Sequence, residues 1–197
     1  MARPIVKREG ILRAALELFV EKGISATTTR DIAERAGSAE GTMYRYFGSK
    51  DDLAVHLYVE NLIMFMANLT EAANSKDCFQ DKLSVMIACF CHLYDEDPTL
   101  YSYLLLSEHA LGAPLPVDLQ TPSSLLLEAT SQAIQKNEIA PDDPFEAAAL
   151  IMGTIVRLTV FHIQGRLNGP LTDRTTSLTA MCWKALAPDT GLTSEET

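Results

Sequence analysis

Three times between residues 97 and 144, the chain places a helix-capping residue directly before a proline: Asp97-Pro98, Thr121-Pro122 and Asp143-Pro144. An Asp or Thr side chain can accept a hydrogen bond from the first free backbone N–H groups of a helix, and proline suits the first helical position because its missing N–H has no partner there. We therefore expect a helix to begin at each of these prolines. No segment shows a convincing strand pattern, so helices set the fold class.

Helical spacing of apolar residues extends this prediction over the whole chain. Residues 5–21 carry an apolar stripe that stops before Gly23, and Ser49 with Asp52 has the pattern of a cap before a long helix. The expected helices are 5–21, 28–36, 39–47, 49–73, 78–94, 98–110, 122–137, 144–166 and 172–187. The chain is predicted to be all-α, with about nine helices, a loop over 111–120 and a loose tail over 191–197.

Charge is distributed unevenly along the 197 residues, whose formal net charge is −10. Residues 1–50 hold nine Lys or Arg and six Asp or Glu, a net charge of +3, which leaves −13 for residues 51–197. A basic head on an acidic body is typical of a protein that binds a polyanion with one part and has a second task for the other.

Several protein classes are not favoured by the sequence. The start has no secretory signal pattern, and the apolar stretch 147–163 is interrupted by Arg157 and His162 and is too short to span a bilayer comfortably. The four cysteines lack metal-ligand spacing and are expected to be free buried thiols, and the four histidines form no catalytic pattern. We expect a cytoplasmic protein that is no enzyme and needs no metal or cofactor.

Residues 28–47 have the layout of a helix-turn-helix, in which two short helices are joined by a turn at Gly37. Thr28 and Asp31 form a capping-box pattern at the start of the first helix. In this motif the second helix lies in the major groove of DNA, while the first crosses the backbone. Gly41 disfavours a helix by about 1 kcal/mol relative to alanine, which makes sense if DNA approaches that backbone closely.

A wider pattern surrounds the motif: Gly23, 28–33 (TTRDIA), Ala36-Gly37, 41–44 (GTMY), Tyr46-Phe47, Ser49-Lys50 and Leu53. Together these residues resemble the N-terminal domain of the tetracycline-repressor (TetR) family. The resemblance implies a DNA-binding domain over 1–50 and a ligand-binding and dimerisation domain over 51–190, before the tail 191–197. It also implies a one-component repressor that binds a palindromic operator as a homodimer until a small effector releases it.

The resemblance further implies which residues contact DNA. The first motif helix would contribute a backbone contact and an arginine, and the start of the second would face the bases. Two tyrosines would hold phosphates, and Lys50 would grip a phosphate near a helix N-terminus, where free N–H groups also favour an anion. The implied residues are Thr29, Arg30, Glu40, Gly41, Thr42, Tyr44, Arg45, Tyr46 and Lys50.

The turn departs from the family pattern, which has an aliphatic residue and then a Ser or Thr cap after the glycine. Here Ser38 and Ala39 occupy those places, so either Ser38 caps with a shifted boundary or the recognition helix starts less firmly. Glu40 is the second departure, because phosphates repel an acid. Since a carboxylate can accept a hydrogen bond from cytosine N4, we hypothesise that Glu40 contributes to sequence selectivity and weakens nonspecific binding.

Other residues near the motif leave alternatives open. Arg3, Lys7 and Arg8 could form a basic arm that reaches phosphates or the minor groove, or could belong to a frayed terminus. The ring of Tyr46 could pack against a neighbouring phenylalanine instead of facing DNA, and Arg35 is expected on a solvated face.

The body of the chain suggests a dimer. Residues 145–168 are apolar nearly all round and rich in small side chains, so a single packing face does not explain them. With the final helix they would form a four-helix bundle between two subunits, where the family dimerises; the alternative is a buried helix in a monomeric core. The expected interface residues are Ala148, Met152, Gly153, Val156, Leu178, Met181 and Trp183.

An effector pocket is expected among the helices between residues 49 and 163, where few charges occur, which favours a mainly apolar or aromatic ligand. Most of the candidates are expected to be ordinary core. They are Met64, Phe65, Phe90, Tyr101, Tyr103, Leu104, Phe161 and His162. Two alternative functions remain: a helical ligand- or partner-binding module with a vestigial DNA-binding head, and a ligand-dependent activator.

Overall fold

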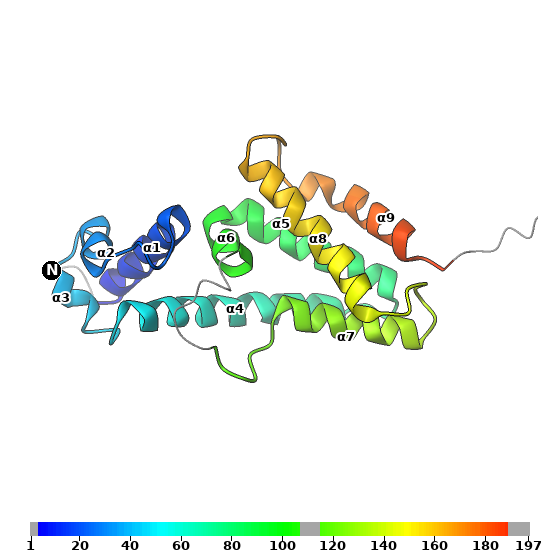
Figure 1. The fold of residues 1–197 in the computed structure, drawn as a ribbon, viewed down its shortest axis with the longest axis horizontal. Helices are drawn as coiled ribbons and strands as arrows, with labels where there is room; N and C mark the ends of the chain where they lie inside the picture. The colour runs from blue at the N-terminus through cyan, green and yellow to red at the C-terminus, as the bar shows by residue number, and fades with distance from the viewer. Residues whose placement is uncertain (1–3, 107–114, 189–197) are drawn as a thin grey trace, which may run out of the picture. The chain divides into compact units, whose positions relative to one another are not determined.

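The computed structural model describes residues 4–106 and 115–188, coloured in Figure 1. Within these ranges it holds nine α-helices, one short 3-10 helix and no strand, so the all-α prediction is confirmed. The elements are α1 (Pro4–Lys22), α2 (Thr29–Arg35), α3 (Glu40–Met43), α4 (Lys50–Asn74), α5 (Phe79–Glu96), α6 (Pro98–Leu106), α7 (Pro122–Gln135), α8 (Pro144–Ile163), η2 (Thr172–Arg174) and α9 (Thr175–Leu186).

All three cap-proline pairs begin helices as predicted. Asp97 accepts hydrogen bonds from the N–H groups two and three residues on, at 3.1 and 3.0 Å. Thr121 forms a capping box with Ser124, and the Asp143 carboxylate accepts the Phe145 N–H at 2.8 Å. Because these signals lie within four residues, they fix the helix starts independently of tertiary contacts.

Helix α3 is shorter than the predicted 39–47. After Met43, the N–H groups of Arg45 and Tyr46 bond to carbonyls three residues back, at 3.3 and 2.9 Å. The Phe47 N–H then bonds to the Met43 carbonyl, four residues back, at 3.0 Å, and both side chains are buried. The recognition segment therefore ends in a turn tighter than an α-helix, with Phe47 buried after it.

The C-terminal helices also end differently from the prediction. Helix α8 was expected to reach residue 166 but ends at Ile163, because Gly165 adopts a left-handed backbone with φ of +69°. The last predicted helix, 172–187, begins as η2 before α9 takes over at Thr175. The end of the predicted helix 98–110, part of the loop 111–120 and the tail 191–197 fall outside the described residues.

By packing, the chain divides into an N-terminal unit (1–65 and 93–119) and a C-terminal unit (66–92 and 120–197), so α4 and α5 each contribute to both. In the N-terminal unit, α1 packs on α2 and α6, around a core that includes Ile11, Phe19 and Ile32. Tyr103 of α6 is fully buried, and its hydroxyl donates to the Ala54 carbonyl at 2.8 Å. Burial raises the pKa of Tyr103 well above its ordinary value, so the hydroxyl stays a donor.

In the C-terminal unit, α8 packs against α7 and α9. The hydroxyl of buried Thr130 lies within hydrogen-bond distance of carbonyls of its own helix and, at 3.1 Å, of the Pro144 carbonyl at the start of α8. The inner side of α8 buries Ala147, Ile151 and Ile155.

Among the described residues, α4 and α8 are long and apolar enough to cross a membrane by length and composition alone. The expectation that the α8 segment is too short is therefore wrong as a statement about length. Buried helices of globular proteins meet the same test, and 44% of the α4 window is buried. Only 22% of the α8 window is buried, so its outer apolar side needs another explanation.

Candidate nucleic-acid interface

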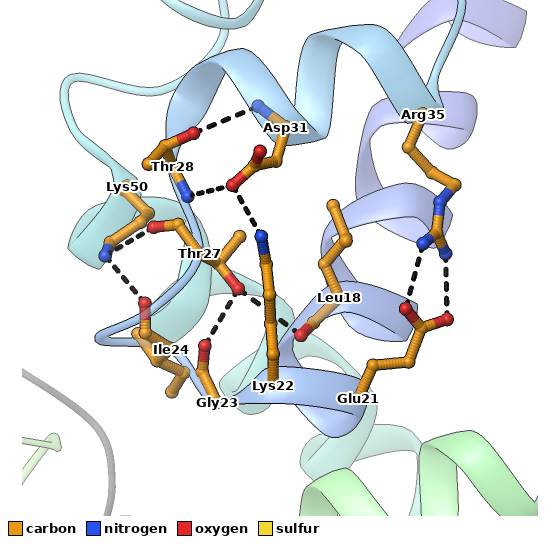
Figure 2. A network of polar contacts seen from close by, with 10 residues as sticks. All are labelled: Leu18, Glu21, Lys22, Gly23, Ile24, Thr27, Thr28, Asp31, Arg35 and Lys50. Carbon is orange, nitrogen blue, oxygen red and sulfur yellow. Dashed lines mark hydrogen bonds and ion pairs between the residues drawn. The ribbon is translucent and has the colours of Figure 1, made fainter.

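The first motif helix, α2, begins at the predicted capping box. The Thr28 hydroxyl accepts the Asp31 N–H at 3.1 Å, and the Asp31 carboxylate accepts the Thr28 N–H at 2.8 Å (Figure 2). Lys22, in the last turn of α1, donates to the same carboxylate at 2.7 Å. This lysine, together with the Thr28 N–H, holds the pKa of Asp31 well below its ordinary value. The start of α2 is thus fixed both by its own cap and by α1.

A second ion pair joins the other end of α2 to α1. The guanidinium of Arg35 donates to both carboxylate oxygens of Glu21, at 2.9 and 2.8 Å (Figure 2). The pair lowers the pKa of Glu21 and raises that of Arg35. Arg35 is exposed, as expected, but it forms a two-pronged pair that the sequence did not predict, because the partners are fourteen residues apart.

Lys50 anchors the loop between α1 and α2. Its ammonium donates to the carbonyls of Ile24 at 2.6 Å and Thr27 at 2.8 Å, while the buried Thr27 hydroxyl turns toward carbonyls of Leu18 and Gly23 (Figure 2). An ammonium has three protons. Two of those of Lys50 thus lie on protein carbonyls, which leaves one for the phosphate contact that the resemblance implies.

The recognition helix α3 starts without a side-chain cap. Ala39 occupies the N-cap position, and the buried hydroxyl of Ser38 finds no hydrogen-bond partner among the described residues. Of the two alternatives, a weakly started helix is therefore the one observed. A side-chain contact also joins the two motif helices, because the Thr29 hydroxyl donates to Glu40 Oε1 at 2.5 Å. The sequence did not predict this contact.

The residues expected to meet DNA divide by exposure. Met43 and Phe47 are buried and, with Ile32 and Ala33, form the apolar interior of the motif. A Cβ on Gly41 would meet no atom within 4 Å beyond its chain neighbours and the backbone of its own helix, so packing does not require glycine there. The exposed members of the expected set are Arg30, Glu40, Gly41, Tyr44 and Arg45; the half-buried ones are Thr29, Thr42, Tyr46 and Lys50.

Two of the open alternatives are also decided in part. The rings of Tyr46 and Phe47 lie with their centroids 6.4 Å apart, so Tyr46 does contact a phenylalanine. Arg8 is held against α4: its guanidinium lies 2.6 Å from His56 Nε2 and 3.5 Å from the Glu60 carboxylate. Arg8 is therefore neither frayed nor a free arm, whereas Arg3 lies outside the described residues.

Comparison with known proteins identifies this arrangement. Residues 11–57, which span α1 to the first turns of α4, match the family model described as "Bacterial regulatory proteins, tetR family". The fatty acid metabolism regulator protein of Bacillus subtilis is 29% identical over 150 residues, which are 74% of this chain and 77% of that one. The chain belongs to the TetR family. It is a helix-turn-helix transcriptional regulator, and the predicted family is confirmed.

Solved structures of TetR-family proteins share the fold over nearly the whole chain. FadR from Bacillus subtilis in complex with stearoyl-CoA has a TM-score of 0.72 at 23% identity, covering 90% of this chain and 98% of that one. The ketosteroid regulator KstR2 of Mycobacterium tuberculosis has a TM-score of 0.72 at 21% identity, covering 92% and 95%. Several further relatives match over only 51 to 57 residues, which are about a quarter of their length.

The residues expected to line an effector pocket fall in both units of this TetR-family protein. Tyr101, Tyr103 and Leu104 are buried in the N-terminal unit, as is Phe65, while Met64 is 56% exposed. In the C-terminal unit Phe90 is buried, and half-buried Phe161 has the guanidinium of Arg157 4.7 Å from its ring centroid. The Nε2 atom of His162 lies 2.9 Å from the Gly169 carbonyl. Tyr103 in particular packs as core.

The expected dimer face is largely accessible. Met181 is 58% exposed and Gly153 is exposed, while Ala148, Met152, Val156 and Trp183 are half-buried. Leu178 is a correction, because it is 2% exposed within the single chain and offers no surface to a partner. A hollow of about 310 Å³ lies between α7 and α8 within the C-terminal unit, and it is lined mainly by apolar side chains, among them those of Leu127, Phe145 and Met152.

Proposed function

We propose that this TetR-family regulator is a repressor that binds a palindromic operator as a homodimer and is released by a small effector. The observation that carries the proposal is the α2–α3 pair, whose outer side presents Arg30, Gly41, Tyr44 and Arg45 while Met43 and Phe47 hold it to the rest of the head. A helix in the major groove needs this combination of a buried inner side and a polar, closely approachable outer side.

The DNA contacts that we propose follow from this placement. Glu40, Gly41 and Thr42 face base edges, Tyr44, Tyr46 and Lys50 hold phosphates, and Arg30 and Arg45 reach base or backbone, while a backbone contact by Thr29 rests on the resemblance alone. The open space at Gly41 supports a close approach of DNA, because nothing in the protein fills it. Cationic contacts to phosphates make affinity fall steeply with salt.

Pairing of two chains through α8 and α9 would explain the outer apolar side of α8. Phe145 and Ile163 near the ends of α8 are 67% and 51% exposed, and Met181 of α9 is 58% exposed. Several large apolar side chains exposed on neighbouring helices are typical of an interface. Two heads held by a dimer can then read two half-sites about one helical turn of DNA, roughly 34–36 Å, apart.

For the effector we propose a mainly apolar molecule in the cytoplasm, and a long-chain acyl thioester is the first to test. A relative with 29% identity is named as a regulator of fatty acid metabolism, and the FadR structure contains stearoyl-CoA. A steroid is the second candidate, since KstR2 is named for ketosteroids and has the same fold.

Selection of bound sites from random DNA tests the proposal. We expect a palindrome, bound by two chains and progressively lost as salt rises. Stearoyl-CoA should then release the DNA, whereas coenzyme A alone should not. Absence of any selected site would overturn the DNA-binding function in favour of a vestigial head, and tighter binding with the effector would favour an activator.

A further inference from the structure

We propose that Thr29 determines operator selectivity as a positioning residue that acts through Glu40. This inference rests on the proposed DNA-binding function and assigns Thr29 a role other than the phosphate contact implied by family resemblance. Thr29 is the first residue of α2 and Glu40 the first residue of α3. Their side chains meet at 2.5 Å, with the hydroxyl donating to the carboxylate.

The proton count separates the two roles. A threonine hydroxyl carries one proton. While that proton lies on Glu40 Oε1, the hydroxyl has none to donate to a phosphate oxygen, which is itself only an acceptor. A hydrogen bond to an ionised carboxylate is shorter and roughly twice as strong as a neutral one, so the proton is firmly held on Glu40, and a phosphate oxygen would have to displace this bond to receive it.

Glu40 has no competing cation to hold it. Among the described residues, no Lys, Arg or His nitrogen lies within 4 Å of its carboxylate, although Arg30 and Arg45 are close in sequence. Thr29 therefore fixes an exposed carboxylate that would otherwise rotate freely.

This fixation matters because Glu40 faces conflicting forces at DNA. Phosphates repel its charge, while an amino group on a base edge, such as cytosine N4, can donate to it. Held by Thr29 through Oε1, the side chain keeps Oε2 available for such a donor. Without Thr29, the carboxylate can turn toward solvent, away from the phosphates, and the base is read less strictly. The contact also joins α2 to the uncapped start of α3.

Thr29→Val tests the inference, because valine keeps the branched shape and removes the donor; Thr29→Ser keeps the donor and serves as the matched control. For wild type, T29V, T29S, E40A and the double variant T29V/E40A, affinities are measured for the selected operator and for operators with one base pair changed at each position. We expect T29V to reduce discrimination at one base pair by roughly 10-fold, as loss of one good base contact does. T29S should retain it, and T29V should add nothing in the E40A background.

A uniform loss of affinity for all operators in T29V, additive with E40A, would show a phosphate contact and overturn the inference. Unchanged discrimination in T29V would also overturn it. Melting curves of each variant distinguish loss of folding from loss of base discrimination. If T29V alone is unstable, comparing T29V/E40A with E40A shows the effect of Thr29 in the background without Glu40. A wild-type protein that selects no DNA site would overturn the proposed function itself, which is a distinguishable result.

Discussion

Helices α1–α3 and helices α7–α9 are held together by different means. Among α1–α3, polar contacts join each helix to the next: Arg35 to Glu21, Lys22 to Asp31, and Thr29 to Glu40. Among α7–α9 the contacts are mainly apolar, and Phe145, Leu150, Ile163 and Met181 stay exposed. Polar contacts thus position the helices of the head, whereas the body leaves several large apolar side chains exposed, as the proposed pairing of two chains requires.

The strongest test of this comparison places a charge on the body. Met181→Glu puts a carboxylate on the exposed side of α9, where burial against a second chain would strand it without a partner. We expect a monomer by sedimentation, and a fall in operator affinity of about 100-fold, because joining two binding sites raises avidity by roughly 10² to 10⁴. Thr176→Glu, at another exposed position of α9, is the control. A fully dimeric M181E with unchanged affinity would place the interface elsewhere.

The next test asks whether the polar contacts stabilise the head or serve DNA alone. Lys50→Met removes the bonds to the carbonyls of Ile24 and Thr27. Hydrogen bonds to charged groups contribute about 1.5–3 kcal/mol, so we expect chemical unfolding to show a loss of about 2 kcal/mol without DNA present. Lys184→Met, which changes an exposed lysine of α9, should change stability little. If K50M lost affinity for DNA but no stability, Lys50 would act on phosphate only.

A smaller effect is expected from restoring the missing cap. Ala39→Ser supplies a hydroxyl at the N-cap of α3 and should stabilise the protein by about 1 kcal/mol. For a chain of this size that corresponds to a rise in melting temperature of about 2–4 °C. Ser38→Ala removes a hydroxyl that makes no hydrogen bond among the described residues and should be neutral. A marked loss in S38A would mean that Ser38 caps α3 in solution.

The smallest effect concerns pH. The folded-state pKa of Asp31 is lowered, chiefly by Lys22. The unfolded chain therefore binds a proton more readily, and the stability that Asp31 contributes is present above its unfolded pKa of about 3.9 and lost as pH falls below it. In urea unfolding, wild type should exceed Asp31→Asn in stability at pH 7, and the difference should shrink toward pH 3. A difference that stays constant over this range would contradict a role for the ionised carboxylate.

Prediction from sequence succeeded where the signal was local. The capping residues at 28, 97, 121 and 143 fixed helix starts, because the donors and acceptors lie within three residues of one another. The motif at 28–50 identified the family because its characteristic residues also lie close together in the sequence. The polar contacts of Lys50, Arg35 and Thr29 were missed because their partners are 11 to 26 residues away, and no spacing rule links them.

In the body, helical spacing predicted the helices but not which side of each helix faces the core. Helical spacing put Leu178 and Met181 together on the expected interface, yet the first faces the core and the second faces outward. On a helix that is apolar nearly all round, periodicity does not distinguish the two directions. The candidate effector residues show the same problem, since aromatic side chains such as Tyr103 fill a core as readily as they line a pocket.

The open space at Gly41 has a genetic consequence. Alanine there would favour the helix and meet no protein atom, so the variant subunit would fold and accumulate normally, while its Cβ would stand where DNA must approach. If subunits pair as proposed, such a subunit would combine with normal ones and leave each mixed dimer with one defective head. In a cell carrying both copies in equal amounts, about three quarters of the randomly formed dimers would contain at least one variant subunit and would be impaired. Loss of repression by substitution at Gly41 would therefore be dominant.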